Sequence, residues 1–87
     1  MPKEKTNRRV GELVIQAIKE QIRLNDPPET KGTFDRLRGE GHAEEEVYQM
    51  LGCVLISEMY EVVKQDRLFD RDLYVQRLQA LPKLPWE

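Results

Sequence analysis

Apolar residues recur at helical spacing in four separate stretches of this chain. In the first stretch the spacing is that of an amphipathic helix, and the apolar positions are Val10, Leu13, Val14, Ala17, Ile18 and Ile22. This pattern predicts a helix over residues 8–24, with residues 1–6 frayed. Asn25 can adopt the left-handed cap conformation, and Pro27 stops further propagation, so the helix is expected to end there.

A second, shorter helix is predicted over residues 27–38. Asp26 is placed to cap it, and Pro27 suits its first position because the missing N–H of proline costs nothing there. Phe34 and Leu37 are its expected core contacts.

The third predicted helix, over residues 43–65, is the most apolar part of the chain. Its first turn carries three glutamates, which the helix dipole favours at that end. From Val47 to Val63 its apolar residues point in nearly every direction around the axis. Such a helix is surrounded by other helices or by another subunit. Gly52 inside it indicates a close backbone approach.

A fourth helix is predicted over residues 70–81, with Asp70 as its cap and Pro82 ending it. In the connection before it, Leu68 and Phe69 are expected to dip into the core.

The residues after the fourth helix form an irregular C-terminal tail. Its Pro82-x-x-Pro85 spacing matches a polyproline recognition pattern, but Leu84 and Trp86 are more simply expected to fold back over the end of the bundle. The sequence therefore predicts an all-α fold, a small four-helix bundle, as one domain over residues 1–87.

Composition and charge narrow the classes of partner. Charged residues make up 34% of the chain, yet 14 basic and 16 acidic side chains nearly cancel, so no global field favours nucleic acid or an anionic membrane. No apolar stretch approaches the about 20 residues that a membrane span needs. Cys53 is the only cysteine and has apolar neighbours, which indicates a buried thiol in a reducing compartment. The expected location is the cytoplasm.

Metal or thiol chemistry has few candidate residues. His42 with Glu45 or Glu46 has the i+3 and i+4 spacing of some metal sites, although a cap or a solvent-exposed role accounts for it as well. Cys53 lacks an activating histidine nearby in the sequence. We therefore expect no catalytic residue, no metal ligand and no cofactor.

Two carboxylates inside helices leave an alternative open. If Glu20 and Glu58 faced each other in the bundle, they could bind metal or act in acid–base chemistry. The simpler expectation is that each lies on a polar face beside a basic residue, as Glu61 does with Lys64.

Nucleic-acid binding would have to use the basic N-terminal segment. That segment contains Lys3, Lys5, Arg8 and Arg9, but no aromatic residue lies among them for stacking. The second and third helices imitate a helix-turn-helix in length. The acidic start of the third helix would nevertheless be repelled by phosphates, which argues against base reading.

Several short runs resemble one family. They are Ala17-Ile18-Lys19-Glu20-Gln21-Ile22, Asp26-Pro27-Pro28-Glu29-Thr30, Val54-Leu55-x-x-Glu58-Met59-Tyr60 and Tyr74-x-x-x-Leu78-x-x-Leu81-Pro82. From about Leu13 onward the layout resembles small bacterial all-helical domains of unknown function. The resemblance implies a bacterial, cytoplasmic helical protein with no assigned activity. Relatives of this kind place histidines in their first and third helices, where this chain has none, so no site carries over.

The function expected from these patterns is a non-enzymatic helical interaction module that either self-associates as a homodimer or binds a protein partner. The third helix carries apolar residues around more of its circumference than the second and fourth helices can cover. The expected interaction surface comprises Met50, Val54, Met59 and Trp86. Two alternatives stay open: a nucleic-acid-associated regulator that uses the N-terminal arm, and a small metal-binding or enzymatic protein.

Overall fold

A computed structural model describes the backbone of residues 2–87 and the side chains of residues 9–87. The chain forms four helices, α1 (Pro2–Leu24), α2 (Pro28–Gly39), α3 (Glu44–Gln65) and α4 (Arg71–Ala80). Residues 2–87 contain no strand, and the tail after α4 is irregular. The predicted all-α, four-helix fold is therefore confirmed.

The helix bounds agree closely with the sequence prediction except at one end. α1 begins at Pro2, whereas the apolar stripe predicted a start near residue 8. Periodicity detects only the part of a helix that carries an apolar stripe. The polar residues before it include lysine, glutamate and arginine, which are good helix formers and extend the helix without such a stripe.

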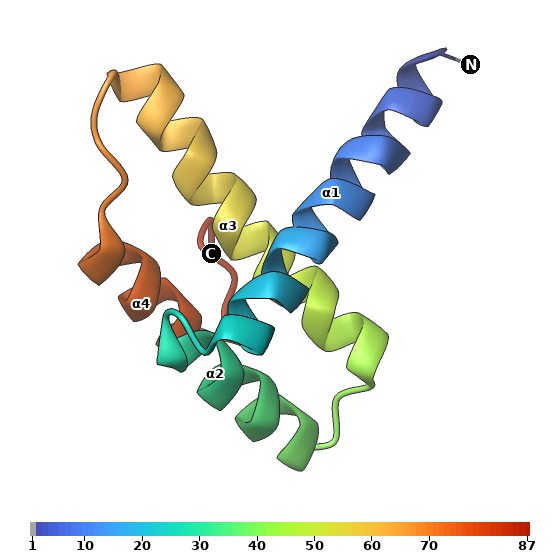
Figure 1. Ribbon diagram of the computed structural model, residues 1–87, viewed down its shortest axis with the longest axis vertical. Helices are drawn as coiled ribbons and strands as arrows, with labels where there is room; N and C mark the ends of the chain where they lie inside the picture. Colours follow the sequence, from blue (N-terminus) through green and yellow to red (C-terminus); the bar gives the residue numbers. More distant parts are fainter. Residues whose placement is uncertain (1) are drawn as a thin grey trace.

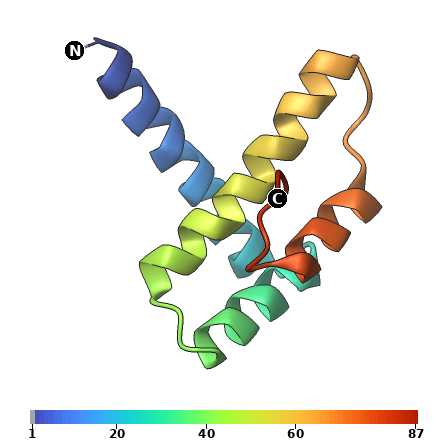
Figure 2. The ribbon, with the colours of Figure 1, turned by 180° about the vertical axis from the view of Figure 1, so that it is seen from behind.

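The two long helices, α1 and α3, cross each other (Figures 1 and 2). Gly52 of α3 lies at the crossing, where a Cβ atom built on it would stand 3.1 Å from Val14 Cγ1. The predicted close approach is confirmed. Beyond the crossing the two helices diverge as the arms of a V, on the side of the molecule away from α2 (Figure 1). We call residues 2–13 the α1 arm and residues 53–65 the α3 arm.

The core fills the space on the other side of the crossing, where all four helices meet. Its buried apolar residues are Val14, Ile18, Leu37, Val47, Leu51, Val54, Leu55, Tyr74, Leu78 and Leu81. The partly buried Phe34 and Tyr48 pack against this core with their ring centroids 5.0 Å apart.

One buried polar contact joins three helices within this core. The Tyr74 hydroxyl of α4 donates to Gln21 Oε1 of α1 at 2.9 Å, and Thr30 Oγ1 of α2 donates to the same oxygen at 2.7 Å. The network satisfies the polar atoms of two buried residues. It also fixes which side of α1 faces α4.

The helix ends use the expected residues in two cases out of three. Asn25 adopts the left-handed conformation (φ 53°), and Asp70 caps α4 by accepting from the Leu73 N–H at 3.1 Å. The prediction for Asp26 is wrong. α2 starts one residue later than expected, so Pro27 is the N-cap, and Asp26 instead pairs with Arg71 at 2.9 Å.

The connection between α3 and α4 does not enter the core as predicted. Leu68 is 89% exposed, and Phe69 is about half-exposed with its edge against the Tyr74 ring. Arg67 turns inward in their place, because its guanidinium binds a buried carboxylate of α3.

The tail covers the end of the bundle with only one of its two large apolar residues. Leu84 packs against the core, whereas the Trp86 side chain is 65% exposed. The expectation that Trp86 folds back over the bundle is therefore wrong.

Candidate functional site

A buried ionic cluster ties the α3 arm to the connection and to α4. Glu58 is fully buried, and Arg67 binds its two oxygens with hydrogen bonds of 2.7 and 2.9 Å. The backbone N–H of Asp70 donates to the same carboxylate at 2.9 Å. Three donors thus replace the water that this carboxylate loses on folding.

Arg77 and Glu61 form a second ion pair beside the pair of Arg67 and Glu58. Arg77 of α4 lies 2.6 Å from a Glu61 oxygen and 3.7 Å from Glu58. Arg67 also lies 3.7 Å from Glu61, so two guanidinium groups share two carboxylates. The cluster is neutral as a whole, which lowers the cost of burying its members.

The electrostatics hold both carboxylates in the ionised form. Hydrogen bonds from Arg67 lower the pKa of Glu58 from its ordinary value, against the opposing effect of burial. The guanidinium of Arg77 likewise lowers the pKa of Glu61. A general base at neutral pH needs a raised carboxylate pKa and a free oxygen. The cluster therefore has the properties of a structural salt-bridge network and not those of a general base.

The sequence interpretation of these acidic residues needs correction. Glu58 does not lie on a polar face, and Glu61 pairs with the two arginines of the cluster and not with Lys64. Glu20 is exposed and pairs with Arg23. Glu20 and Glu58 therefore do not converge on a site. Sequence spacing missed the cluster because Arg67 and Arg77 lie outside the helix that carries the carboxylates.

The other candidate chemical groups stay apart. His42 Nδ1 lies 3.0 Å from Glu46 Oε1, a contact across one helical turn. Within the part of the chain that the structure describes, no three histidine, cysteine or acidic side chains gather as metal ligands. Cys53 is half-buried, and its burial raises the pKa of the thiol, which favours the less reactive protonated form.

Outside the core, the face of the α3 arm that continues from Gly52 presents an apolar stripe to solvent; we call it the outer face because the core lies on the other side of the helix. Ile56, Met59 and Val63 follow Gly52 at intervals of four, three and four residues, the spacing of a coiled-coil seam. All three side chains are exposed, Val63 to 81%, and Tyr60 lies exposed beside them.

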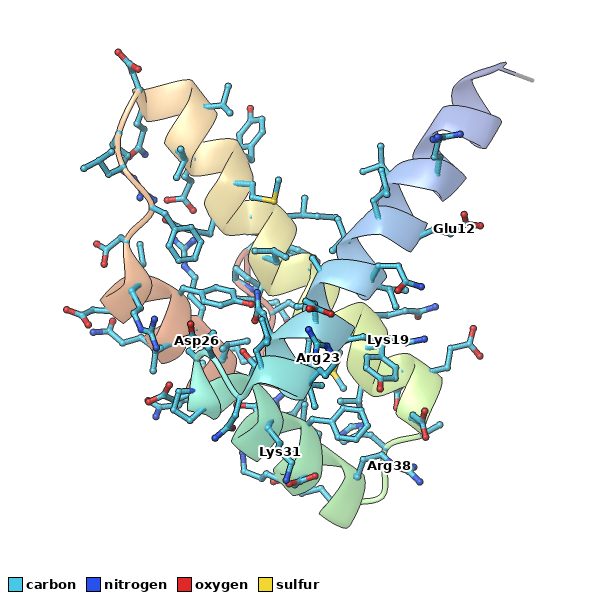
Figure 3. All side chains as sticks on the ribbon, viewed as in Figure 1. Glu12, Lys19, Arg23, Asp26, Lys31 and Arg38 are labelled. Carbon is cyan, nitrogen blue, oxygen red and sulfur yellow. The ribbon has the colours of Figure 1, made fainter. Side chains whose placement is uncertain are left out.

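The last turn of the α1 arm carries a shorter apolar stripe. Val10 and Leu13 are exposed, Leu13 to 62%, and their spacing continues through Ala17 to Gln21. Since Gln21 binds Tyr74, this stripe lies on the side of α1 that faces α4 and the α3 arm. Glu12 points away from the V (Figure 3).

We name the combined surface the apolar V. Its members are Val10, Leu13, Ile56, Met59, Tyr60 and Val63. A shallow groove at the crossing joins the two arms, and its lining includes Val14, Ile15 and Cys53. Of the six members, Ile56 also lines this groove.

The predicted interaction residues fall into three environments. Met59 and Trp86 are exposed, Met50 is half-buried, and Val54 is fully buried in the core. Val54 therefore cannot contribute to a surface. The seam spacing that starts at Gly52 would have identified Met59, but it gives no information on Met50 or Trp86.

Two further observations bear on partners. The side chains of Lys3, Lys5 and Arg8 in the basic N-terminal segment lie outside the described residues. Among residues 2–87, no helix combines the length and the apolar character that crossing a membrane requires.

Comparison of this chain with protein-family models, with curated proteins and with solved structures gives no match.

Proposed function

We propose that this protein is a non-catalytic helical module that self-associates through the apolar V. The observation that carries the proposal is the exposure of apolar side chains on both arms of the V, on the sides that face each other. Such a continuous apolar surface is typical of protein–protein contact sites. Single exposed apolar residues scattered over a surface would carry no such meaning.

The amount of exposed surface supports the proposal. The chain exposes 6180 Å², whereas a monomer of its 10.3 kDa mass exposes about 5,400 Å². The excess of about 800 Å² is of the same order as the area that one partner buries in a standard protein–protein interface. The radius of gyration, 13.0 Å, likewise exceeds the about 12 Å of a compact chain of this length.

The two other functions that the sequence left open receive less support. For nucleic-acid binding, the three exposed glutamates at the start of α3 disfavour phosphate contacts by that helix, and the N-terminal arm that the alternative relies on lies mostly among residues whose side chains are not described. The buried carboxylate of Glu58 is saturated by Arg67 and Asp70, so no oxygen remains for a metal or a substrate.

Sedimentation equilibrium of the purified chain tests the proposal. We expect a species of twice the 10.3 kDa chain mass, in concentration-dependent exchange with monomer. The double variant Met59→Glu with Val63→Glu is expected to be monomeric, because it places two charges in the seam. Since both side chains are exposed, the variant should keep its helical circular dichroism.

Leu24→Glu provides the matched control. Leu24 is 57% exposed but lies at the other end of α1, outside the apolar V. It should associate like the unmodified chain. A wild-type protein that stays monomeric at high micromolar concentration, or a seam variant that still dimerises fully, would contradict the proposal.

A further inference from the structure

We propose that the apolar V is filled by a second copy of this chain, with the α1 arm of each copy packed along the α3 arm of the other. This inference rests on the proposed self-association and adds which surfaces meet. The alternative pairings place the two α1 arms together and the two α3 arms together.

The two arms leave the same crossing and have matching lengths. At 1.5 Å per residue, the α1 arm spans about 18 Å and the α3 arm about 20 Å. A Cβ atom built on Gly11 of the α1 arm would meet nothing within 4 Å. Space therefore remains beside α1 next to the point where the arms separate. The apolar part of the α1 arm is its last turn, with Val10 and Leu13, whereas the stripe of the α3 arm from Ile56 to Val63 extends over about two turns.

Formal charge distinguishes the possible pairings. Residues 2–13 contain four basic and two acidic side chains, a charge of +2. The α3 arm with its following loop, residues 53–70, contains two basic and four acidic side chains. Arg77 of α4 pairs with Glu58 and Glu61 as well, so this side of the V carries a charge of −1. Pairing an α1 arm with an α3 arm joins opposite charges, whereas pairing like arms joins charges of the same sign.

Symmetry makes this pairing reciprocal. In a twofold dimer, a contact from the α1 arm of one copy to the α3 arm of its partner is repeated in the opposite direction. Both stripes of both copies are then covered. The four arms would form a helical layer with the crossing grooves at its two ends.

A mixing experiment tests the pairing without knowledge of the register. One variant carries Val10→Glu and Leu13→Glu in the α1 arm, and the other carries Met59→Glu and Val63→Glu in the α3 arm. Each variant alone is expected to be monomeric, because both reciprocal contacts contain a damaged arm. Mixed in equal amounts, they regain one undamaged α1–α3 contact and should form a heterodimer.

Detection uses sedimentation velocity with one variant labelled by a fluorophore on its N-terminal amine. We expect the labelled species to double in mass only in the mixture. Leu24→Glu by itself serves as the matched control, because it should dimerise without a second variant. Both variants gain negative charge, so non-specific attraction cannot produce the heterodimer.

The outcomes separate the two proposals. Wild-type dimers together with no heterodimer in the mixture would overturn the reciprocal pairing and leave self-association intact. A monomeric wild-type protein would overturn both. As a second measurement, raising NaCl from about 50 to about 500 mM should weaken the wild-type dimer, because salt screens opposite charges. A dimer that tightens with salt would contradict the charge pairing.

Discussion

The two halves of α3 place their charged and apolar residues in opposite ways. In the first half, Val47 and Leu51 are buried and the three glutamates of the first turn face solvent. In the second half, Glu58 is buried and Val63 is among the most exposed side chains. The first half follows the ordinary rule for a soluble helix. The second half departs from it at these two positions, although Leu55 is buried in the core.

This difference shows that burial and apolar character have separate roles in the α3 arm. Glu58, the buried charged residue of the arm, accepts hydrogen bonds from Arg67 of the connection, so it stabilises the single chain. The apolar residues outside contribute nothing to the described core. An apolar surface is favourable only when another surface removes it from water. The outer face therefore points to association, and the inner face to stability.

The largest expected effect comes from the inner face of the first half. Leu51→Ala should lower the free energy of unfolding by about 3 kcal/mol, because it removes buried methyl groups and leaves a cavity. Ile56→Ala, on the outer face, should change it by less than about 1 kcal/mol at low protein concentration. Urea unfolding followed by circular dichroism measures both. Equal losses would contradict the distinction between the faces.

The next largest expected effect on stability comes from Glu58, the buried carboxylate in the second half of α3. Glu58→Gln keeps the side-chain shape but leaves the guanidinium groups of Arg67 and Arg77 with one carboxylate between them. We expect a loss of about 2 kcal/mol, below the usual range for a buried pair because both arginines are partly exposed. The same urea experiment measures it.

Glu20→Gln is the matched control for this substitution. Glu20 pairs with Arg23 at the surface, where an ion pair contributes little, so no measurable change in the free energy of unfolding is expected. If the two glutamine variants lost the same stability, the buried cluster would have no special role.

Acid should reveal the same cluster through its pH dependence. The pKa of Glu58 is lowered in the folded protein, so the folded state binds its proton less readily than the unfolded state does. The stabilisation is therefore complete above the ordinary carboxyl pKa and is lost as the pH falls through the folded value. Between about pH 5 and pH 3, the wild type should lose more stability than Glu58→Gln. Parallel pH profiles for the two proteins would contradict this role.

The sequence predicted the fold well because most of the fold depends on local signals. Apolar spacing located the four helices, and Asp70 was recognised as a cap because its role involves residues three positions away. The start of α1 was missed, since a polar helical arm has no stripe to reveal it. Asp26 was misassigned because a shift of one residue in a helix start removes a cap.

The candidate site was harder to predict because it depends on contacts between distant residues. Glu58 meets Arg67 across a loop and Arg77 from another helix, so helical spacing alone cannot pair them. Met59 was placed correctly at the surface, but Val54 was not. The two residues lie on opposite sides of α3, and the apolar character of a residue does not show which side of the helix faces the core.

The smallest expected effect on stability comes from Asp70, and it distinguishes the contribution of the α4 cap from that of the buried cluster. Asp70 has two roles: its carboxylate caps α4, and its backbone N–H donates to Glu58. Asp70→Ala removes only the cap, so it should cost about 1 kcal/mol, less than Glu58→Gln. Asp70→Asn keeps a capping oxygen and should cost a few tenths of a kcal/mol at most. Urea unfolding of the three variants measures the order. If Asp70→Ala were as damaging as Glu58→Gln, the cap and not the buried carboxylate would be what holds the α3 arm to α4.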